Sequence, residues 1–237
     1  MRAETRHSLK QDQFTRATVE AADWTVAHKS KIVAAIVILA ALLLVGGGVW
    51  YYLSQQERKA SFALNQALRT SQTPVRPANM PAQPGLTTFA SSAERDSATR
   101  KQYQDVVDQY SHTRSGDIAR YLLGVTEANQ GDYAAAEGNL NKVSSVFDKD
   151  LSSLAKFALA SVYAKEKKDS QAIDLYKKLM DSPSNTVTKT TVQFRLAELY
   201  TEKQQPLEAK RIYEQIQKEN PATEIAAAAQ SKAAEIK

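Results

Sequence analysis

The chain has 237 residues and no cysteine, which excludes structural disulfides, thiol chemistry and iron–sulfur or cysteine-ligated zinc sites. Ala, Leu, Lys, Gln and Glu are abundant while only 8 Gly and 7 Pro occur, a composition typical of helical proteins. The formal net charge of +5 could suggest nucleic-acid binding, but its distribution argues against it. Residues 1–92 hold 10 Lys and Arg against 5 Asp and Glu, whereas residues 93–237 hold 21 of each and are neutral.

Residues 1–31 form a leader in which one short amphipathic helix is predicted. Its apolar members recur at helical spacing, with charged residues on the other faces, and they are Phe14, Ala17, Ala21, Trp24 and Ala27. Such a helix suits either a membrane surface or the surface of a partner protein. The pattern does not decide between these two roles.

Residues 32–53 contain no charge and are predicted to cross a membrane. As a helix they would measure about 33 Å, against about 30 Å for the hydrocarbon core of a bilayer. Lys31 bounds the segment on one side, and on the other Trp50 begins a Trp-Tyr-Tyr cluster, which favours the headgroup boundary. A cleaved signal peptide would have a shorter apolar stretch. A buried core helix would rarely be apolar on every side.

The charges that flank this segment leave its orientation open. Within about 20 residues of the span, the positive-inside rule compares Lys and Arg on the two sides. The two sides are balanced, with Arg16, Lys29 and Lys31 before the span and Arg58, Lys59 and Arg69 after it.

Two connecting segments follow the span. Residues 54–70 keep a helical composition and are expected to extend the spanning helix into water. Residues 71–92 hold Pro74, Pro77, Pro81 and Pro84, and proline both removes donors and holds the backbone extended. We therefore expect an exposed, semi-rigid linker here, with a proline-rich ligand for another domain as the alternative.

Three repeated units begin at Ala119, Ala155 and Val192. Each unit has a Leu followed by a small residue, and the pairs are Leu123 and Gly124, Leu159 and Ala160, and Leu196 and Ala197. Each then has an alanine and, four residues later, a large residue: Ala136 and Leu140, Ala172 and Tyr176, and Ala209 and Tyr213. Turn residues such as Gly131-Asp132 separate the two halves. Each unit is therefore predicted to be a helical hairpin whose apolar flank only a neighbouring unit can bury.

This pattern closely resembles the tetratricopeptide repeat. Tyr163 and Tyr200 match the Tyr of its first helix, and Pro221 matches its closing Pro. The chain departs from the pattern at the first Trp, whose positions hold Arg120, Lys156 and Gln193, and at Glu127, which replaces the Tyr of the first unit. The resemblance implies an all-α protein, in which residues 93–237 form an α-solenoid of about three to four hairpins.

Both ends of the repeat region have predicted additions. Tyr103 lies in a segment with the character of a second helix, so an earlier half-unit is expected. Its first helix would lie around residues 89–95 or be supplied by the segment after the span. At the other end, residues 223–236 are predicted to be a capping helix, with Thr223 as its N-cap.

The resemblance also predicts where partners bind. In such arrays the first helices line a concave groove, which places these residues on or beside it: Tyr121, Val125, Phe157, Ser161, Phe194 and Glu198. The alternative is that the aromatic residues only pack between hairpins. The sequence shows no glycine-rich phosphate loop and no nucleophile elbow, and its histidines are scattered. We therefore predict a non-enzymatic, protein-binding function without a cofactor, a metal or a small-molecule substrate.

The order of leader, single span, aromatic boundary, helix and repeats resembles the bacterial ancillary SecYEG translocon subunit family. The resemblance implies an inner-membrane anchor through residues 32–53, a cytoplasmic N-terminus and periplasmic repeats. It also implies a scaffold whose partners are translocon components, chaperones or exported polypeptides, besides membrane lipid. The alternative is a structural assembly factor of another envelope complex, such as a pilus, a polysaccharide exporter or a Tol-Pal-like assembly.

Overall fold

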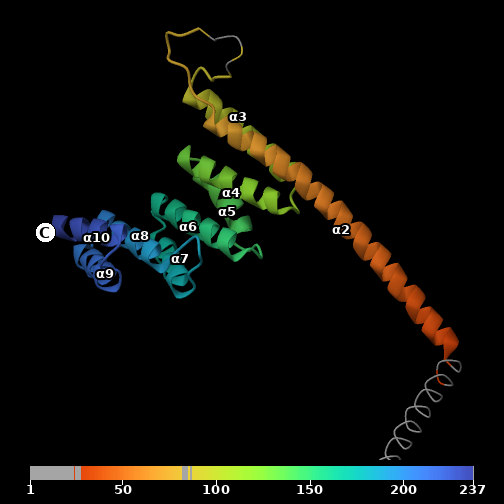
Figure 1. Ribbon diagram of the computed structural model, residues 1–237. Helices are drawn as coiled ribbons and strands as arrows, with labels where there is room; N and C mark the ends of the chain where they lie inside the picture. The colour runs from red at the N-terminus through yellow and green to blue at the C-terminus, as the bar shows by residue number, and fades with distance from the viewer. Residues whose placement is uncertain (1–23, 25–27, 82–84, 86, 237) are drawn as a thin grey trace, which may run out of the picture. The chain divides into compact units, whose positions relative to one another are not determined.

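The computed structural model describes residues 24, 28–81, 85 and 87–236 (Figure 1). Nine helices, α2 to α10, lie in these residues, and the β contact among them is an isolated bridge between Val75 and Phe89. The predicted all-α fold is therefore confirmed. The predicted leader helix lies outside the described residues apart from Trp24, whose ring stacks on His28 with centroids 4.7 Å apart.

Of the helices bounded within the described residues, α2 (Lys29–Gln72) comes first in the chain, has 44 residues and includes both the predicted span and the predicted extension. The chain divides into two compact units, Met1–Gln55 and Gln56–Lys237, and α2 contributes to both. Its apolar side chains in the first unit are exposed, with Leu44 at 78% of its full exposure. The helix is long and apolar enough to span a membrane.

The other helices of the described residues all belong to the second unit. They are α3 (Ser92–Gln109), α4 (Arg114–Asn129), α5 (Tyr133–Val143), α6 (Lys149–Lys165), α7 (Asp169–Asp181), α8 (Lys189–Glu202), α9 (Pro206–Glu219) and α10 (Glu224–Glu235). Several begin at an N-cap whose side chain accepts a backbone N–H of the first turn, at Ser91, Thr113, Asp132, Asp148, Thr188 and Thr223. These caps satisfy donors that have no partner within the helix.

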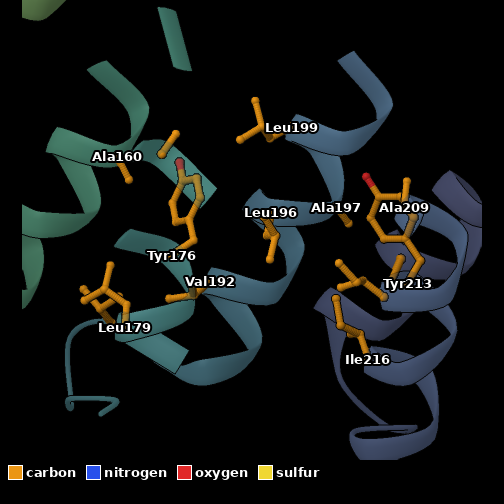
Figure 2. Packing of buried hydrophobic residues seen from close by; sticks show 14 of the residues in the cluster. Ala160, Tyr176, Leu179, Val192, Leu196, Ala197, Leu199, Ala209, Tyr213 and Ile216 are labelled. Carbon is orange, nitrogen blue, oxygen red and sulfur yellow. The ribbon is translucent and has the colours of Figure 1, made fainter. Parts of the chain in front are cut away.

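Each sequence unit forms one helical hairpin. α4 packs on α5, α6 on α7 and α8 on α9, and neighbouring hairpins meet where α5 contacts α6 and α7 contacts α8. The largest core cluster joins the second and third hairpins to α10, whose Ala226 and Ala229 are buried. Figure 2 shows this cluster, with Tyr176, Leu196 and Tyr213 pointing into the space between the helices. α10 is thus the predicted cap, and Thr223 is its N-cap.

The additional unit before the three hairpins includes part of α2. Leu64 and Ala67 of α2 are buried in one cluster with Tyr103 of α3 and Leu123 of α4. The C-terminal part of α2 therefore supplies the first helix of the additional unit, which is one of the two possibilities that the sequence left open. Residues 73–91 join α2 to α3 within this unit, so they connect its two helices and not a helical extension to a separate repeat domain.

Two charged contacts fix this additional unit to the next one. The Glu57 carboxylate of α2 accepts hydrogen bonds from the Ser115 hydroxyl at 2.6 Å and from the Ser115 backbone N–H, at the start of α4. Arg100 of α3 pairs with Glu127 of α4 at 3.2 Å and with Asp132 at 2.7 Å. Glu127 is 3% exposed, so Arg100 and the Asn139 amide, 2.8 Å away, compensate the burial of its charge.

The turns inside the three hairpins share one backbone conformation. Gly131, Lys167 and Gln204 occupy equivalent positions and have φ of 81°, 61° and 56°. This left-handed conformation is unfavourable for a residue with a Cβ and is not unfavourable for glycine. We expect Lys167→Gly to raise the free energy of unfolding by about 1 kcal/mol, measured by urea denaturation of the full chain in detergent. Gly131→Ala is the reciprocal control and should lower it, and equal effects of the two changes would contradict the argument.

Candidate partner-binding groove

The six residues predicted for the groove lie on the first helices of the three hairpins. Tyr121 and Val125 are on α4, Phe157 and Ser161 on α6, and Phe194 and Glu198 on α8. All six side chains are partly buried. The structure therefore places them at equivalent points along the array, but it gives the aromatic and the polar members different surroundings.

Two of the three aromatic residues, Phe157 and Phe194, pack on tyrosines of their own hairpins. The Phe157 ring meets the ring of Tyr176 on α7 edge-on, with centroids 5.8 Å apart, and Phe194 meets Tyr213 on α9 in the same way at 5.5 Å. Such edge-to-face pairs add about 0.5–1.5 kcal/mol to the burial of the rings. Burial also raises the pKa of the Tyr121 phenol. These three side chains thus contribute to stability, whatever part of them a partner contacts.

A hollow of about 220 Å3 lies between α6 and α8. Ser161 and Glu198 line it, whereas Phe157 and Phe194 are not among its lining residues. The other lining residues were not singled out for the groove by the sequence, and they are Ala164, Lys165, Tyr176, Arg195, Leu199 and Glu202. Arg195, Glu198 and Glu202 are three and four residues apart, so they share one face of α8, which is the signal that could have indicated them.

The hollow contains polar groups already held in place. The Tyr176 hydroxyl and the Ser161 hydroxyl share a hydrogen bond of 3.1 Å, and burial raises the pKa of Tyr176. Arg195 pairs with Glu198 at 2.7 Å, which raises the pKa of Arg195. Lys165 and Glu202 add one charge of each sign. This set can hydrogen-bond the backbone and polar side chains of a polypeptide, and it offers no nucleophile with an adjacent base.

The residues assigned to repeat packing are buried throughout. They are Leu123, Gly124, Ala136, Leu140, Leu159, Ala160, Ala172, Tyr176, Leu196, Ala197, Ala209 and Tyr213. α4 and α5 approach each other closely at Gly124, where an added Cβ would lie 2.8 Å from Leu140 Cγ. The small member of each Leu-small pair thus lets the two helices of a hairpin approach each other.

Stacked helical hairpins closed by a capping helix define a helical-repeat protein of the solenoid class. Residues 24–181 match the family model for the tetratricopeptide repeat-like domain, which covers more than half of the chain, and residues 191–223 match the tetratricopeptide repeat. The chain therefore belongs to the tetratricopeptide repeat-like family. Domains of this kind are generally non-enzymatic protein-interaction modules. The search of curated proteins found no match to this chain.

The close approach at Gly124 predicts a large difference between two glycine substitutions. Gly124→Ala places a methyl group against Leu140 and should lower the free energy of unfolding by about 1–3 kcal/mol. Gly138 of α5 is the matched control, because a Cβ there would meet nothing within 4 Å. Gly138→Ala should stabilise the helix by about 0.5–1 kcal/mol. Urea unfolding measures both, and a stabilising Gly124→Ala would refute the packing argument.

Proposed function

We propose that the protein is a membrane-anchored scaffold whose repeat array binds other polypeptides along its first helices. The observation that carries this proposal is the nature of α2. One continuous helix has an exposed apolar half, long enough for a bilayer, and a second half that buries one face, with Leu64 and Ala67, in the core of a tetratricopeptide-like array. Exposure of an apolar surface of this length to water is unfavourable, whereas its burial in lipid is favourable.

Retention of the apolar segment is part of the proposal. A cleaved signal peptide has an apolar stretch of about 7–15 residues. Here the apolar stretch ends at residue 53, but the same helix continues without a break into residues 57–67, which contact α3 and α4 through Leu64, Ala67 and Glu57. Cleavage at the end of the apolar stretch would cut inside α2. A peptidase cleaves a helical segment poorly, because its substrate must be extended in the active site. The helix thus acts as an anchor.

The anchor lies in the inner membrane of a bacterium, with the N-terminus in the cytoplasm and the repeats in the periplasm. There the protein is an accessory factor at the translocon and links exported proteins to periplasmic chaperones. The support for this role is the resemblance in layout to the ancillary translocon subunits, together with a family whose domains bind proteins. The hollow between α6 and α8, with its hydroxyls and paired charges, is the proposed contact site for these partners.

The orientation is tested by reporters fused after Lys237. Alkaline phosphatase folds only in the periplasm and green fluorescent protein fluoresces only when folded in the cytoplasm. We expect the phosphatase fusion to be active and the fluorescent fusion to be dark, because the resemblance to the ancillary translocon subunits implies periplasmic repeats. The reverse pattern would place the repeats in the cytoplasm and overturn the translocon role.

The contact site is tested by photocrosslinking in cells. A photoreactive amino acid at Ser161 or Glu198 should crosslink to translocon components, chaperones or exported polypeptides. Lys210, exposed on α9, is the matched control position and should give few products. Combining the probe at Ser161 with Arg195→Ala should weaken the crosslinks, because it removes a charge from the same hollow.

The products also separate this function from its alternative. Recovery of pilus or polysaccharide-export subunits without translocon components would favour an assembly factor of another envelope complex. Equal crosslinking from Ser161 and Lys210 would contradict the groove itself.

A further inference from the structure

A second hollow, of about 160 Å3, lies between the first half of α6 and the last turns of α7. It shares no lining residue with the hollow between α6 and α8. Three of its lining residues are lysines and none is acidic, and the set is Lys149, Ser152, Ser153, Lys156, Leu175, Lys178, Leu179 and Ser182. One of these residues, Lys156, is a departure from the tetratricopeptide pattern, because it occupies the position of the first Trp.

Two acidic residues near the start of α6 have partners outside the hollow. The Asp148 carboxylate accepts the backbone N–H of Leu151 and pairs with Arg114 at 3.0 Å. Asp150 accepts the backbone N–H of Asn185 at 3.0 Å. Within the part of the chain that the structure describes, none of the three lysines of the hollow forms an ion pair. Asp174 and Asp181 of α7 are not among the lining residues, so no carboxylate in the lining compensates these positive charges.

The third hairpin shows what fills the equivalent place there. Thirty-seven residues further along the chain, the equivalents of Ser152, Lys156, Lys178 and Ser182 are Lys189, Gln193, Gln215 and Glu219. The Glu219 carboxylate accepts hydrogen bonds from Gln215 at 2.8 Å, from Gln193 at 3.4 Å and from Lys189 at 3.4 Å. These bonds, that of Gln215 first, lower the pKa of Glu219. In the third hairpin, the side chains at this place thus donate hydrogen bonds to one carboxylate, that of Glu219.

The second hairpin has lysines at two of the three donor positions but lacks the carboxylate, and the hydroxyl at the third position, Ser152, donates to the Ser144 carbonyl oxygen at 2.6 Å. Ser182 replaces the glutamate and is shorter and uncharged, while two of the three donor positions hold lysine in place of glutamine. Because a lysine ammonium binds a carboxylate more strongly than a neutral amide does, the donors here are the stronger set. We propose that this hollow binds a carboxylate of a partner polypeptide, either an acidic side chain or a C-terminus. This site is independent of the groove proposed above.

The direct test uses the full chain in detergent and a fluorescently labelled peptide that ends in Glu-Glu with a free carboxylate. The control peptide ends in Gln-Gln with an amide. We expect fluorescence anisotropy to show binding of the acidic peptide only, weakening with salt because the contact is electrostatic. Lys156→Gln/Lys178→Gln installs the residues of the third hairpin and should weaken binding by roughly tenfold or more. Lys142→Gln/Lys210→Gln, with the same change of charge at exposed positions, should leave binding unchanged.

A second variant supplies the carboxylate within the chain. Ser182→Glu reproduces Glu219, so it should abolish binding of the acidic peptide and raise the melting temperature, whereas Ser182→Gln should do neither. Tight peptide binding by Ser182→Glu would overturn the proposal, as would equal effects of the two double lysine variants. Competition identifies the source of the anion. Inorganic phosphate or vesicles with anionic lipid that displace the peptide as effectively as unlabelled peptide would refute a polypeptide ligand.

Discussion

The repeat array depends on the close approach of the two helices within each hairpin. The second residue of each Leu-small pair, Gly124, Ala160 or Ala197, leaves room for the facing helix, and the large residues of that helix then become buried. Burial of these apolar flanks is the main favourable contribution, and a hairpin alone cannot achieve it. The array is therefore stable only as a stack, which α10 closes at one end and the C-terminal part of α2 closes at the other.

The start of the array differs from the rest because it uses charge as well as apolar packing. Where the repeat pattern has Tyr, Glu127 brings a carboxylate into the interior, and Arg100 and Asn139 compensate it. Glu57 caps the start of α4 from another helix. Removing one partner of such a contact leaves a buried group without compensation, so these contacts fix one arrangement of α2, α3 and α4. A helix that is also the proposed anchor is thereby held in the core.

The two hollows show how one repeated geometry yields different chemistry. Between α6 and α8, cations and anions occur together and a hydroxyl pair is held in place, which suits the mixed polar groups of a polypeptide. Inside the second hairpin, the lysines occur without an anion, and the same place in the third hairpin holds Glu219. The hairpins share a fold because their buried residues match. Their hollows differ in polar lining because these polar residues are not constrained by packing.

The sequence by itself determined the apolar segment, the phase of the repeats and the capping helix, because each depends on local periodicity and on caps such as Thr223. It also indicated the first helices as the face for partners, through the family resemblance. Only the tertiary structure decided that Leu64 and Ala67 belong to the core, that Phe157 and Phe194 pack on tyrosines, and that Arg195 and Glu202 line a hollow. The reason is physical. A period within one helix shows which face is apolar, but which helix covers that face, and which polar groups then meet, depends on contacts between residues far apart in the chain.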